Sequence, residues 1–153
     1  MTLLDNEDAL DFGPLPPAID ALLQAGVAAH FTDPEQAEAR FREAIALAPD
    51  ILPAHRCLFK HYNRRRQFAA AHAAAGAWLA AASRQAGLAD DWRGWTDAPG
   101  YALAALKGLA FILLRLGRRD EAAAALDVLL RLDPEDGVGG SVVAALLPEA
   151  EAT

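Results

Sequence analysis

Four side chains in the middle of the sequence have the chemistry to bind a metal ion: His55, Cys57, His61 and His72. Cys57 and His61 are four residues apart, so in a helix they share one face, and His72 would approach from the next helix. Structural zinc usually takes paired cysteine or histidine ligands from two segments. A buried thiol and helix-packing histidines explain the same residues, so we expect neither a metal site nor a cofactor.

No arrangement typical of a catalytic site stands out elsewhere. Asp90 and Asp91 are adjacent carboxylates without a histidine nearby in sequence, which suits a solvated turn. The chain has no nucleophile elbow. Its glycine-rich stretch at residues 137–141 lacks the lysine and the preceding strand of a phosphate-binding loop. We therefore expect that the protein is not an enzyme.

Positive charge is concentrated in the middle of an acidic chain. The formal net charge is −7, which argues against a general affinity for nucleic acids. All 14 basic residues lie within residues 40–131, where eight acidic residues accompany them, so that stretch carries a net charge of +6. Residues 1–39 and 132–153 contain Asp and Glu but no Lys or Arg. The net positive charge of residues 40–131 favours an anionic partner for this part of the chain.

Composition predicts a helical protein of the cytoplasm. Hydrophobic residues make up 54% of the chain and aromatic residues 7%, which suits a core of alanine and leucine. The acidic start lacks the basic residues and apolar run of a secretion signal. A membrane span needs about 20 apolar residues, and the best candidate, residues 103–116, is shorter and contains Lys107 and Arg115. A single cysteine, Cys57, forms no intrachain disulfide, which favours a reducing compartment.

Proline, glycine and apolar spacing divide the chain into an extended acidic segment, a helical body and a tail. The segment covers residues 1–16 and the tail residues 148–153. Long helices are predicted at 17–31, 34–48, 53–65, 68–86, 101–116 and 121–132. A connector with two tryptophans occupies residues 87–100, and Ser141 is the expected cap of a last short helix within residues 139–147.

A small residue, a large apolar residue and a proline recur at fixed spacing. They are Ala37, Phe41 and Pro49 in one copy, and Ala122, Leu126 and Pro134 in the other. In both copies the alanine and the proline are twelve residues apart. A small side chain lets two helices approach closely, and a proline ends the second helix. The spacing predicts helical hairpins of about 34 residues, here at 17–49, 52–86 and 101–134.

These residues resemble the tetratricopeptide repeat (TPR) family over roughly residues 17–134. The third hairpin matches the family pattern at eight positions from Leu106 to Pro134. The middle hairpin matches poorly, because Phe59 replaces a small residue and Ala75 a large one. The resemblance implies an all-α solenoid of three hairpins with a short C-terminal capping helix. More narrowly, the segments LDFGPLPP (10–17), WRGW (92–95) and DPEDGVGGSV (133–142) are similar to small bacterial repeat proteins encoded among nitrogen-fixation genes.

In the TPR family, the first helix of each hairpin lines a concave groove that holds an extended peptide or a partner helix. The resemblance places the groove at Arg56, Lys60, Asn63, Arg64, Lys107, Phe111 and Arg115. Arginine and lysine along such a wall can bind carboxylates. The alternative is that these long basic side chains are solvated and merely cover apolar surface.

The two tryptophans of the connector, Trp92 and Trp95, also have two explanations. Buried aromatic side chains often anchor a protein–protein interface. A connector of this length must also be held in place, and tryptophan can fix it to the helices. We favour the second role and keep the first open.

The function that these features favour is protein–protein interaction, with an acidic peptide, a C-terminal tail or a partner helix in the basic groove, and with no nucleic acid or membrane. The acidic residues 1–12 could themselves occupy the groove until a partner displaces them. The resemblance implies a role as an accessory factor in bacterial nitrogen fixation. The alternative is a structural role, in which the chain forms a homodimer through the alanine-rich helix 68–86 and the tryptophan connector. A third, less favoured alternative is an enzyme or a metal carrier.

Overall fold

The computed structural model describes residues 10–148. This part of the chain forms seven α-helices, one short 3-10 helix and no strand, which confirms the predicted all-α class. The helices are α2 (Pro17–Ala29), α3 (Pro34–Leu47), α4 (Leu52–Arg64), α5 (Phe68–Ala86), η1 (Trp92–Gly94), α6 (Gly100–Arg115), α7 (Arg119–Leu132) and α8 (Gly140–Ala144). Most of the predicted acidic segment and the tail after residue 148 lie outside the described residues.

Local chemistry explains where the first helices begin. Pro17 and Pro34 occupy the first turn of α2 and α3, where the missing N–H would have no intrahelical partner. Asp33 caps α3 by accepting a hydrogen bond from the backbone N–H of Gln36 at 3.2 Å. The turn pattern of the sequence therefore sets the starts of these helices to within a residue of their predicted positions.

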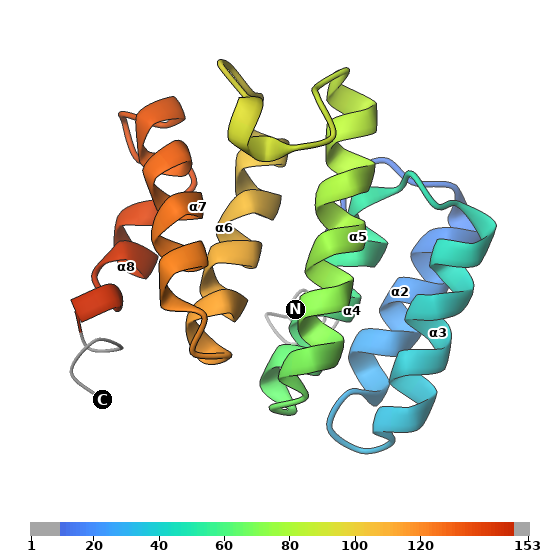
Figure 1. The fold of residues 1–153 in the computed structure, drawn as a ribbon. Coiled ribbons are helices and arrows are strands. Elements are labelled where there is room, and N and C mark those ends of the chain that lie inside the picture. Colours follow the sequence, from blue (N-terminus) through green and yellow to red (C-terminus); the bar gives the residue numbers. More distant parts are fainter. Residues whose placement is uncertain (1–9, 149–153) are drawn as a thin grey trace.

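The helices stand side by side in a row, and each packs mainly on the helices immediately before and after it in the chain (Figure 1). The row runs from α2 and α3 at one end to α7 and α8 at the other. α2 packs extensively on α3 but makes little contact with α4, although both lie on the same side of the row. This separation leaves space between α2 and α4 for the site described below.

Small side chains allow close packing through the middle of the row. The buried core consists mostly of alanine and leucine, with Trp78 among its few large rings. Gly108 of α6 faces that ring: a Cβ atom at this position would lie 2.8 Å from Cζ3 of Trp78. The α5–α6 contact therefore depends on the absence of a side chain at residue 108.

The last helix differs from its prediction. α8 covers only Gly140–Ala144, and the residue that precedes it is Gly139, with φ of 79°, rather than Ser141. Ser141 lies inside the helix, where its backbone N–H and its hydroxyl donate to the two carboxylate oxygens of Asp136 at 3.0 and 2.5 Å. Asp136, which lies outside the helix, thus accepts a hydrogen bond from a backbone N–H in the first turn of α8. The prediction that Ser141 caps the helix was wrong.

No helix between residues 10 and 148 combines the length and the apolar character that crossing a membrane requires.

Candidate functional site

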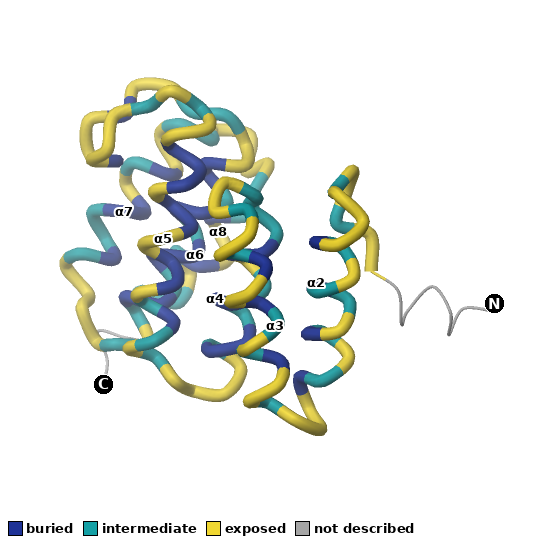
Figure 2. Tube along the Cα trace, turned by 90° about the vertical axis from the view of Figure 1, so that its right-hand side faces the viewer, coloured by how far each residue is buried: buried dark blue, intermediate teal, exposed yellow. Residues whose placement is uncertain are grey.

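A cavity of about 500 Å³ lies between α2 and α4. Residues of α3, α5, α6 and the segment before α2 complete its walls. Much of the lining is apolar or aromatic, and the larger side chains are Phe12, Phe31, Phe41, Leu52, Trp78 and Tyr101. Figure 2 shows the backbone of α2 standing apart from that of α4, in keeping with the few contacts between these helices. Its size is within the usual range of small-ligand and side-chain pockets, roughly 300–1,000 Å³.

Three cations of α4 lie along one wall of this cavity. Arg56, Lys60 and Arg64 are spaced four residues apart, so they follow one face of the helix. The opposite face is buried, with Leu58 and Tyr62 in the core, which fixes the direction of the basic face. No acidic side chain among residues 10–148 forms an ion pair with any of the three.

The cations raise the positive potential of one another. Burial lowers the pKa of Lys60, and the nearby charges of Arg56, Arg64 and Lys107 lower it further. A lysine surrounded by cations and partly removed from water gains from any anion that approaches it. The wall is therefore suited to binding a carboxylate or another anion.

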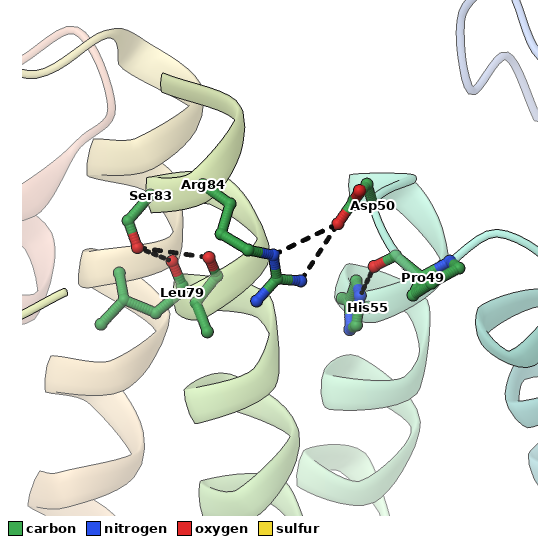
Figure 3. Close-up of polar contacts among 7 residues, drawn as sticks. Pro49, Asp50, His55, Leu79, Ser83 and Arg84 are labelled. Carbon is green, nitrogen blue, oxygen red and sulfur yellow. Dashed lines mark hydrogen bonds and ion pairs between the residues drawn. The ribbon is translucent and has the colours of Figure 1, made fainter. Parts of the chain in front are cut away.

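Polar contacts at the turn between α3 and α4 hold the start of α4 in place (Figure 3). The Nε2 atom of His55 lies 2.7 Å from the carbonyl oxygen of Pro49. Arg84 of α5 forms an ion pair with Asp50 at 3.0 Å. Because this turn contacts both α4 and α5, the position of the first turn of α4 is fixed, and with it the start of the basic wall.

Two histidines meet at the cavity, His30 directly after α2 and His61 within α4. The Nδ1 atoms of His30 and His61 are 2.7 Å apart, and both side chains are buried. With both rings neutral, one Nδ1 donates its proton to the other.

The residues considered for metal binding have different surroundings. His55 contacts Pro49, and His61 contacts His30. Cys57 and His61 line the cavity, and His72 does not. Burial raises the pKa of the Cys57 thiol to about 11, so the thiol is protonated at neutral pH. Within residues 10–148 no group of three or more histidine, cysteine or acidic side chains is placed to hold a metal ion.

The other residues predicted for the groove do not line the cavity. The Lys107 ammonium donates to the carbonyl oxygen of Val138 at 2.7 Å. The Arg115 guanidinium lies 4.9 Å from the ring centre of Phe68 and 5.2 Å from that of Phe111. The Oδ1 atom of Asn63 is buried and has no hydrogen-bond partner within the described part of the chain. The charge of Lys107, in α6, still lowers the pKa of Lys60.

The connector tryptophans are buried. Trp95 is 2% exposed, and its indole N–H donates to the carbonyl oxygen of Ala89 at 2.9 Å. Trp92 lies in η1, which packs against α7, and the Arg93 guanidinium is 4.3 Å from its ring centre. Their burial favours the role of fixing the connector over contact with a partner.

The sequence suggested the acidic residues 1–12 as an occupant of the basic groove, but it did not indicate that Leu10 and Phe12 form part of a cavity wall. Leu10, Asp11 and Phe12 line the cavity, and so does Phe31. Phe31 is 87% exposed, an unusual state for a phenylalanine beside a cavity. The only signal in the sequence was the occurrence of two large apolar residues around an acid before the proline-rich start of α2.

Comparisons of the chain with protein-family models, with curated proteins and with solved structures find no match.

Proposed function

We propose that the protein is a TPR-like α-solenoid that binds an acidic segment of another protein along the basic face of α4. A second proposed contact surface continues along α6, through Lys107, Phe111 and Arg115. The helices packed in sequence order support this proposal, because such rows present long surfaces for binding. Rigid helices also lower the entropy cost of ordering the binding residues.

One observation carries the proposal. Five arginines elsewhere on the described surface have carboxylate partners: Arg40, Arg42, Arg84, Arg93 and Arg118. The three cations beside the cavity have none among residues 10–148, although the chain has a net charge of −7. A local positive field within an acidic protein attracts an anionic partner to this place rather than to the surface in general.

Charge reversal tests the proposal. The Lys60→Glu/Arg64→Glu variant should no longer retain an acidic partner, because two attractive charges become repulsive. Partners are captured from cell lysate and quantified by mass spectrometry, with wild type and variant compared. We expect retention of the specific partner to fall at least about tenfold, which corresponds to about 1.4 kcal/mol.

The matched control is Arg118→Glu/Arg131→Glu, which changes the net charge equally at residues outside the cavity and away from α4. The control should retain the partner, and circular dichroism should show equal helicity in all three proteins. Equal loss in both variants would mean that net charge, not the α4 face, determines binding. Unchanged capture by the Lys60→Glu/Arg64→Glu protein would refute the proposal.

A further inference from the structure

The segment Leu10–Phe12 forms one side of the cavity without filling it. The Gln24 side chain holds this segment by accepting a hydrogen bond from the N–H of Leu10 at 3.1 Å and donating one to its carbonyl oxygen at 2.5 Å. Phe12 packs against the hydrophobic core. With these residues in place the cavity still measures about 500 Å³. The segment is therefore part of the wall.

Asp11 does not neutralise the basic wall. Its carboxylate accepts a hydrogen bond from the N–H of Gly13 at 2.8 Å and forms no ion pair with a described residue. Among residues 10–148, Arg56, Lys60 and Arg64 thus have no anionic partner, and exposed aromatic surface lies in the same lining at Phe31 and Tyr101. A ligand that satisfies both features has a carboxylate directly beside a large ring.

The aromatic lining comes from separate elements that converge on one volume. Phe12, Phe41 and Trp78 belong to the N-terminal segment, α3 and α5, respectively. Phe31, which follows α2, adds a ring that is almost fully exposed. Rings from several directions favour an aromatic guest, because aromatic pairs gain from edge and offset contacts beyond the area that they bury.

From this geometry we infer that the cavity binds an aromatic side chain of the partner, adjacent in sequence to an acidic residue that pairs with the α4 cations. Leu10 and Phe12 are binding residues in this arrangement, not an internal competitor. The inference rests on the proposed binding of an acidic segment and specifies what that segment contains: a Glu-Phe or Asp-Phe pair in an extended peptide.

Three labelled peptides test the inference on the full chain by fluorescence anisotropy. The first is acetyl-Gly-Glu-Glu-Phe-Glu-Gly-amide, the second has serine in place of phenylalanine, and the third has glutamine in place of all three glutamates. Burial of a phenylalanine ring and loss of the charges predict that the second and third peptides bind about tenfold to a hundredfold more weakly. Equal affinity of the phenylalanine and serine peptides would overturn the inference.

A protein variant tests the role of the segment before α2. Phe12→Ser should weaken binding of the phenylalanine peptide several-fold and leave the affinity for the serine peptide nearly unchanged, because only the first peptide contacts that ring. The control is Leu47→Ser, which removes an exposed apolar side chain outside the cavity. Tighter binding by the Phe12→Ser protein would show that the segment blocks the site, which contradicts the inference.

The test separates the two proposals. If the phenylalanine and serine peptides bind equally and Lys60→Glu/Arg64→Glu abolishes both, the basic face binds acidic segments and the aromatic pocket is wrong. If wild type binds neither peptide, the acidic-segment proposal fails and the inference fails with it. Circular dichroism confirms in each case that the variants have the helicity of the wild type.

Discussion

The Nδ1 atoms of His30 and His61 are 2.7 Å apart, so in the neutral pair one of them donates a hydrogen bond and the other accepts it. Two imidazolium ions at this distance would both present N–H groups to each other and would repel. Burial is the largest cause that lowers the pKa of each histidine. The charges of Arg64 and Arg65 lower the pKa of His30 further, and those of His30 and Arg65 lower that of His61, with Glu38 opposing at His61. The contact is therefore a feature of the neutral state.

The sign of the resulting pH dependence follows from proton uptake. In the unfolded chain these histidines become protonated near the ordinary pKa of 6.5. In the folded protein their pKa is lower, so they become protonated only at a lower pH. The unfolded state therefore binds more protons below pH 6.5, and the free energy of unfolding falls as the pH falls through this range. We expect urea denaturation midpoints to decrease from pH 7 to pH 5.

A double variant assigns this pH dependence to the pair. His30→Leu/His61→Leu should flatten the decrease, because neither side chain titrates. The control His72→Leu removes a histidine of α5 that does not line the cavity and should keep the wild-type slope. The same steep decrease in the double variant would show that carboxylates elsewhere, rather than this pair, cause the acid sensitivity.

At the scale of the helices, the contact between α5 and α6 depends on Gly108. A methyl group there would overlap with the Trp78 ring at 2.8 Å, so the ring or one of the two helices must shift. Overpacking of this kind usually costs about 1–3 kcal/mol. We expect Gly108→Ala to lower the free energy of unfolding by that amount in urea denaturation, despite the higher helix propensity of alanine.

Gly76 supplies the matched control within the same pair of helices. It also lies inside a helix, α5, but a Cβ atom there would meet nothing within 4 Å. Gly76→Ala should therefore stabilise the protein by about 0.5–1 kcal/mol through helix propensity alone. If both alanine variants are stabilised equally, the Trp78 ring moves aside freely and the close contact is not a constraint.

The sequence predicts the helices better than it predicts which side chains contact one another between helices. Proline and apolar spacing are local, so α5 begins and ends at the predicted residues, 68 and 86. The His30–His61 pair joins residues 31 apart in sequence, and no local pattern relates them. The resemblance to TPR repeats placed the basic residues of α4 in a groove, and the spacing within one helix puts them on one face. Phe12 and Phe31 were missed because their proximity depends on the path of the chain around α2.

At the scale of the whole molecule, packing mainly between sequence neighbours makes the ends of the row different from its middle. α5 and α6 are covered on both sides, whereas α8 has only five residues, ends the row and exposes its own Val142. Stability in such rows is a sum of local helix stabilities and neighbour contacts. Amide hydrogen exchange should therefore be slowest in α5 and α6 and faster in α2 and α8.

Two core substitutions test whether destabilisation stays local. Leu23 and Leu106 are both fully buried, one in α2 at the end of the row and the other in α6 in its middle. Either change to alanine should cost about 2–5 kcal/mol. Leu23→Ala should speed exchange in α2 and α3 and leave α6 and α7 protected, because few contacts connect these pairs. Leu106→Ala should speed exchange on both sides, in α5 and in α7. Equal acceleration in all helices of the Leu23→Ala protein would instead establish one cooperative unit, in which the opening between α2 and α4 cannot widen without global unfolding.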